Sequence, residues 1–270
     1  MRTAFLRDSL RVLTVVFSLA GAAPAFAAEL QITVTNNQPA GGFAIAPVWI
    51  GIHDGTYSPF TPGTTASPAL ETLAELGDTS QLAAAFSGLG AETTVGSMPY
   101  VPGAMASALL NVANPAVDQY LSFAAMVVPS NDFFMGNSDP KAFHLFDSSG
   151  NFVGPMTILV YGRNVWDAGT EVDNINYGAA FIVGDNATDH VAANGTIGPV
   201  FGGSIDHTAY LNSILGKATP AGYDISHLIS PNDLIATIQI SSVPEPSTMI
   251  MLGMGISGAF LAARRSRKRA

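Results

Sequence analysis

Residues 29–36 read ELQITVTN, so Leu30, Ile32 and Val34 alternate with polar neighbours. Strict alternation over this length is typical of a half-buried β-strand. The same period of two returns in DLIATIQISSV, residues 233–243, and two further apolar segments, 142–146 and 156–163, flank the turn DSSGN. Clusters of Gly, Pro, Asn and Asp separate these segments, which favours an antiparallel β architecture.

One helix interrupts the strands. Ser67 is suited to an N-cap, Pro68 to the first helical position, and Gly77 to the end of the helix. A second short helix is predicted to begin at Asp78 or Thr79. The sequence therefore predicts a mainly β protein, a two-sheet antiparallel sandwich with one or two short helices over an open end.

The N-terminus has the layout of a secretory signal peptide. Arg2, Arg7 and Arg11 precede an apolar run, and the small-residue pattern Ala25-Phe26-Ala27 follows it. We expect cleavage between Ala27 and Ala28, so residues 1–27 are excluded from the fold.

The C-terminal residues 244–270 carry a second targeting signal. The motif Pro244-Glu245-Pro246 precedes an uncharged stretch, residues 249–263, and five basic residues close the chain. This order resembles the PEP-CTERM sorting tail of Gram-negative bacteria. The resemblance implies recognition by an exosortase, cleavage at or near the motif, and a short transmembrane helix that holds the protein only transiently. The positive-inside rule keeps the basic end cytoplasmic. The alternative is a permanent tail anchor.

Residues 28–243 are predicted to form one strongly acidic domain. They keep three of the 11 basic residues of the chain, Lys141, Arg163 and Lys217, against 18 of its 20 acidic residues, a formal net charge of −15. Such a surface excludes nucleic-acid binding and attracts cations. Because the chain has no cysteine, the domain must be stabilised by its own hydrophobic core.

Several segments, in order, resemble the spondin N-terminal domain that occurs in F-spondin and mindin. These are residues 32–78, residues 121–137 and WDAGTE at residues 166–171; VPSNDFF at 128–134 and WDAGT at 166–170 are the most specific. The resemblance implies a C2-like antiparallel β-sandwich that holds calcium at one end and serves adhesion or matrix attachment. The disulfide and the thrombospondin-type partner domain of animal members are absent, so their partners are not carried over.

Calcium binds six to eight oxygen ligands, and acidic loops supply them. The resemblance identifies Asp132 and Asp167 as the first candidate ligands and Glu171 as the next. Asp118, on the approach to the segment 121–128, is a fourth candidate that no motif fixes. Asp173 is interpreted as an ordinary solvated loop acid.

No catalytic residue is predicted. The five histidines show no H-E-x-x-H pair, and GGSID around Ser204 is not a G-x-S-x-G elbow. We expect a secreted, surface-sorted, calcium-binding and non-catalytic module of adhesion or of the extracellular matrix, whose partner is an extracellular polysaccharide or a matrix protein. Two alternatives stay open. One is a secreted hydrolase of extracellular polysaccharide, because the separation of paired acids is a spatial quantity, and the other is a purely structural matrix component.

Overall fold

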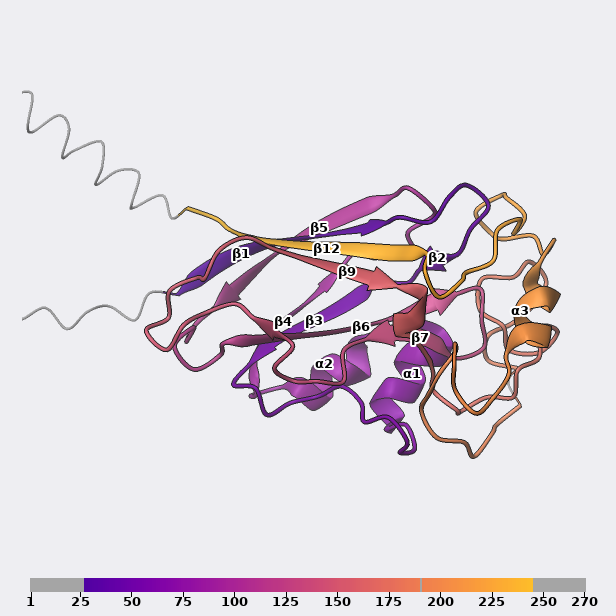
Figure 1. The fold of residues 1–270 in the computed structure, drawn as a ribbon, viewed down its shortest axis with the longest axis horizontal. Coiled ribbons are helices and arrows are strands. Elements are labelled where there is room, and N and C mark those ends of the chain that lie inside the picture. Colours follow the sequence, from indigo (N-terminus) through magenta and orange to yellow (C-terminus); the bar gives the residue numbers. More distant parts are fainter. Residues whose placement is uncertain (1–26, 190, 245–270) are drawn as a thin grey trace, which may run out of the picture.

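The segments with a period of two form the first sheet of a β-sandwich (Figure 1). A computed structural model describes residues 27–189 and 191–244. The first sheet has the antiparallel order β5 (Met105–Val112), β1 (Ala28–Asn36), β12 (Leu234–Ser242) and β9 (Met156–Tyr161). Alternate side chains of β1 and β12 point into the core, as the sequence predicted.

The second sheet carries the site described below. Its order is β11 (Gly198–Pro199), β10 (Val165–Asp167), β7 (Phe133–Gly136), β6 (Tyr120–Val128), β3 (Val48–His53) and β4 (Gly90–Val95); β2 (Ala44–Ile45) and β8 (Phe143–His144) pair with β6. β3 and β6 are buried almost throughout, because both of their faces are covered. The mainly β class with two antiparallel sheets is confirmed.

The first two helices form where the sequence predicted them. α1 (Pro68–Leu76) begins after Ser67, whose hydroxyl accepts a 3.2 Å hydrogen bond from the Leu70 amide, and ends at Gly77, which has φ +66°. α2 (Ser80–Phe86) follows directly. A third helix, α3 (Thr208–Ile214), and a 3₁₀ turn, η1 (Gly162–Asn164), were not predicted.

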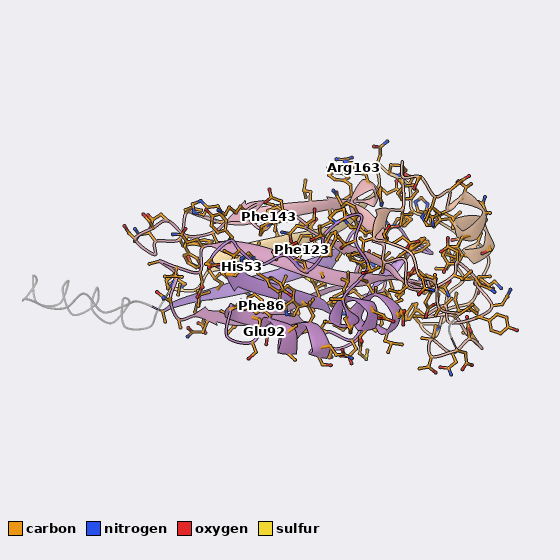
Figure 2. The ribbon with its side chains drawn as sticks, turned by 90° about the horizontal axis from the view of Figure 1, so that it is seen from below. His53, Phe86, Glu92, Phe123, Phe143 and Arg163 are labelled. Atoms are coloured by element: carbon orange, nitrogen blue, oxygen red, sulfur yellow. The ribbon has the colours of Figure 1, made fainter. Side chains whose placement is uncertain are left out.

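The expected position of the helices over an open end of the sandwich was wrong. α1 and α2 pack against the outer face of the second sheet, where Leu73 and Phe86 belong to one apolar cluster with Trp49 and Phe134. Figure 2 shows Phe86 beside His53, with ring centroids 6.2 Å apart. Because this face of the sheet is apolar, it must be covered, and the two helices remove it from water.

The two ends of the described chain lie at the same pole of the sandwich. Leu30 near the start of β1 pairs with Ser242 at the end of β12. α3 and the loops around it occupy the opposite pole (Figure 1). The predicted signal peptide, apart from Ala27, and the predicted transmembrane helix of the sorting tail fall outside the described residues. Within residues 27–189 and 191–244, no helix is long and apolar enough to cross a membrane.

Candidate metal centre

Two loops meet at the pole that carries α3. The loop of Ser130, Asn131 and Asp132 joins β6 to β7, and the segment 168–174 follows β10. β10 pairs with β7 so that Asp167 lies opposite Phe133, and the Ala168 amide donates a 3.2 Å hydrogen bond to the Asp132 carbonyl. The structure therefore brings Asp132 and Asp167 together, although 35 positions separate them in the sequence.

Asp132 is completely buried. Its Oδ2 accepts hydrogen bonds from the backbone amides of Thr170 (2.8 Å) and Glu171 (3.1 Å). Its Oδ1 is buried and has no hydrogen-bond partner among the described residues. Burial raises the pKa of Asp132 above its ordinary value, and the two amides oppose the shift only in part. A buried carboxylate oxygen without a donor costs free energy unless a proton or a cation compensates it.

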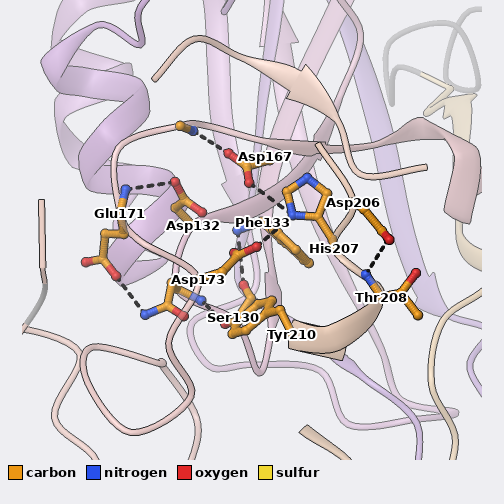
Figure 3. Close-up of polar contacts among 12 residues, drawn as sticks. Ser130, Asp132, Phe133, Asp167, Glu171, Asp173, Asp206, His207, Thr208 and Tyr210 are labelled. Atoms are coloured by element: carbon orange, nitrogen blue, oxygen red, sulfur yellow. Dashed lines mark hydrogen bonds and ion pairs between the residues drawn. The ribbon is translucent and has the colours of Figure 1, made fainter. Parts of the chain in front are cut away.

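Asp167 faces the same space from β10 (Figure 3). Its Oδ1 accepts a 2.5 Å hydrogen bond from the Gly169 amide. Burial, followed by the negative charge of Asp132, raises the pKa of Asp167 to about 7. Gly169 has φ +70°, and a Cβ there would lie 2.8 Å from the backbone nitrogen of Thr196, so this turn requires glycine.

Glu171 turns toward other partners. Its side chain accepts a 3.0 Å hydrogen bond from the Asn131 amide group. Burial raises the pKa of Glu171 to about 8, and the negative charges of Glu75 and Asp132 add to this effect. Glu75, on α1, is itself only 5% exposed. Sequence reasoning missed Glu75, because a glutamate in a surface helix is usually solvated.

Asp173 and His207 complete the cluster, and the sequence analysis assigned neither of them to it. His207 Nδ1 lies 2.8 Å from Asp173 Oδ2 and 3.5 Å from Asp167 Oδ2. Burial lowers the pKa of His207, but the hydrogen bond and the charges of these two carboxylates outweigh it, so the net shift is upward. The interpretation of Asp173 as a solvated acid was wrong, since its Oδ2 is within hydrogen-bond distance of His207 and its Oδ1 is buried. No local motif links two residues that lie so far apart in the sequence.

Asp118 does not join the cluster. It precedes β6 whereas Asp132 follows it, and nine residues of strand span roughly 30 Å. Asp118 instead lines a cavity of about 560 Å³ with Asp54, Asn111 and Asn114.

Comparison with known proteins gives two matches. The Spondin_N family model matches residues 43–188, which include Asp132, Asp167, Glu171 and Asp173 but not His207. The PEP-CTERM protein-sorting motif matches residues 242–268, which include Pro244, Glu245 and Pro246. No curated protein matches the chain.

Proposed function

Because the chain belongs to the Spondin_N family and ends in a PEP-CTERM sorting motif, we propose that it is a calcium-stabilised, non-catalytic module of adhesion or of the extracellular matrix. The sorting motif indicates a secreted or cell-surface protein that is exported across a membrane, and it implies recognition by an exosortase. The calcium ion, the adhesive role and the extracellular partner are parts of the proposal.

The observation that carries the proposal is the unpartnered Oδ1 of the fully buried Asp132. It lies in a cluster that also holds Asp167, Asp173, Glu171 and Glu75. No lysine or arginine in the described part of the chain forms an ion pair with Asp132, Asp167 or Asp173. Such a set of oxygens suits a hard cation, which would compensate the buried negative charge. Asp132, Asp167 and Glu171 would hold calcium, and Glu75 is added to this set by its position.

The position of the cluster suits a role in adhesion. The sorting motif begins at the pole where β12 ends, and the acidic cluster lies at the other pole (Figure 1). While the tail is held in the membrane, the cluster and α3 would point away from the cell surface. An extracellular polysaccharide or a matrix protein would bind at this outward-facing pole.

A binding experiment tests the role. The processed protein, recovered from the producing cell, is applied to arrays of polysaccharides and to isolated matrix, with calcium and with chelator. Retention that requires calcium, and that Asp132→Asn abolishes, supports the proposal. If the protein is retained neither with calcium nor with chelator, the result favours a purely structural matrix component.

One observation favours the alternative of a secreted hydrolase of extracellular polysaccharide. Hydrogen bonds from Thr56 lower the pKa of Asp54, whereas partial burial and the charge of Asp54 raise the pKa of Asp118, and both residues line the 560 Å³ cavity. Glycosidases use two carboxyl groups whose pKa values are separated in this way. Release of reducing sugars by the wild type, lost in Asp118→Asn, would establish the hydrolase and reject the non-catalytic reading.

A further inference from the structure

One nitrogen donor lies among the carboxylates of the candidate metal centre. His207, directly before α3, is 3% exposed, and its ring packs edge-on against Phe133 at 5.3 Å between centroids. Its Nδ1 points toward the carboxylates of Asp173 and Asp167 (Figure 3). Calcium and magnesium prefer oxygen ligands, whereas imidazole nitrogen suits zinc and other transition-metal dications.

We propose that Asp167, Asp173 and His207 form a second cation site, which takes a transition-metal dication such as zinc. One ligand atom from each residue lies within 4.8 Å of the other two. Zinc binds imidazole nitrogen and carboxylate oxygen at about 2.0–2.2 Å, so its ligand atoms are separated by no more than roughly 4.4 Å. A movement of a few tenths of an ångström brings the three residues to this spacing. Three protein ligands leave a fourth position open.

Asp132 provides an independent reason to expect a cation there. Its Oδ1 is completely buried and finds no hydrogen-bond donor in the described structure. The negative charge of Asp132 acts on Asp167, and the negative charge of Asp173 acts on both groups. Figure 3 shows the Asp132 carboxylate between Glu171 and the Asp167–Asp173 pair. The charge of Asp132 also acts on His207, so this buried carboxylate adds to the negative potential at the proposed site.

The charge of the cluster also leaves room for two ions. Five carboxylates gather there: Glu75, Asp132, Asp167, Glu171 and Asp173. Asp132, Asp167 and Asp173 alone bring three carboxyl groups together, which is more negative charge than one dication neutralises when all three are ionised. His207 lies outside residues 43–188, so the matched family segment does not supply the nitrogen ligand. Asp167 lies between the two sites and is shared by them.

The competing explanation is that protonated His207 is itself the counter-ion of Asp167 and Asp173, without a metal. Zinc titration of the processed protein by calorimetry, in saturating calcium, separates the two. We expect one zinc ion per chain, and at least a tenfold loss of zinc affinity in His207→Gln and in Asp173→Asn. His227→Gln is the matched control, because His227 is also near an aspartate, 3.5 Å from Asp233, but its side chain is 45% exposed. This variant should bind zinc as the wild type does.

The same variants keep a failure of this site distinct from a failure of the calcium proposal. His207→Gln and Asp173→Asn should retain the stabilisation by calcium, and Glu171→Gln should weaken it while zinc still binds. If His207→Gln does not fold, Asp173→Asn carries the test, since the Asp173 side chain is 23% exposed and tolerates replacement more readily. Absence of zinc binding, equal binding by His207→Gln and wild type, or one-for-one displacement of calcium by zinc would each overturn the second site.

Discussion

Oδ2 of Asp132 accepts a 2.8 Å hydrogen bond from the backbone amide of Thr170, 38 positions away in the sequence. The next amide, that of Glu171, donates to the same oxygen at 3.1 Å. One buried carboxylate therefore fixes the loop that supplies the other acids of the cluster. Its second oxygen stays available for a ligand.

This contact predicts different outcomes for two replacements of Asp132. Asp132→Asn keeps an oxygen for the two amides and removes a buried charge, so in chelator its free energy of unfolding should stay close to that of the wild type. Asp132→Leu leaves both amides buried without an acceptor and should lower that free energy by about 2 kcal/mol or more. Urea unfolding in chelator measures both. Equal stability of the two variants would show that the hydrogen bonds do not hold the loop.

The pH dependence of stability without calcium follows from the raised pKa values. The folded pKa is about 7 for Asp167 and about 8 for Glu171, above their ordinary values of 3.8 and 4.5. At pH values between the ordinary pKa and the raised pKa of each group, the folded state binds more protons than the unfolded state. The free energy of unfolding therefore falls as the pH rises. His207, whose pKa is also raised, changes stability in the same direction.

In chelator, the midpoint of thermal unfolding should therefore be lower at pH 8.5 than at pH 6. A loss of about 1 kcal/mol corresponds to roughly 2–4 °C for a domain of this size. Saturating calcium should reduce this dependence, because the cation favours the ionised carboxylates. A midpoint in chelator that rises with pH over this range would contradict the raised pKa values of these buried acids.

The N-cap of α1 gives a test of the fold that is independent of any metal. Ser67→Ala removes the acceptor of the Leu70 amide and should cost about 1 kcal/mol in the free energy of unfolding. Thr65→Ala is the matched control, since Thr65 is exposed and lies just before the helix. Chemical denaturation compares the two. If Ser67→Ala lowers the free energy of unfolding no more than Thr65→Ala does, the N-cap hydrogen bond does not stabilise α1.

Processing should remove both ends of the chain. The intact mass of protein recovered from the native cell surface or medium should correspond to an N-terminus near Ala28 and to the loss of everything after about Glu245. The reason is that both terminal segments serve as targeting signals and are not parts of the fold. A chain that still ends at Ala270 would favour a permanent anchor.

The parts of the fold that the sequence predicted have a local cause. β1 and β12 follow from their period of two, and α1 follows from Ser67, Pro68 and Gly77. α3 lacks such signals, because no side chain caps its start and it is only seven residues long. The placement of α1 and α2 depended on which sheet is apolar on both of its faces. Periodicity alone does not reveal this.

The candidate site was predicted only where motifs identified its residues. Asp132 and Asp167 meet as the resemblance implied, through the pairing of β7 with β10. Glu75, Asp173 and His207 come from three separate elements and join only in the folded chain. Asp118 lies before β6, as the sequence analysis had it, but the other acids gather beyond the opposite end of the strand, so it was wrong to group it with them.

Calcium binding by the wild-type protein decides whether the acidic cluster is a calcium site. Calorimetric titration gives the dissociation constant, and thermal unfolding with calcium and with chelator gives the stabilisation. Calcium at about 100 times its dissociation constant should add roughly 2.7 kcal/mol. Asp132→Asn and Asp167→Asn should abolish the shift, Glu171→Gln should weaken it, and magnesium should substitute poorly because it demands a tighter octahedral shell. Calorimetry that detects no calcium binding to the wild type would show that these carboxylates do not form a calcium site.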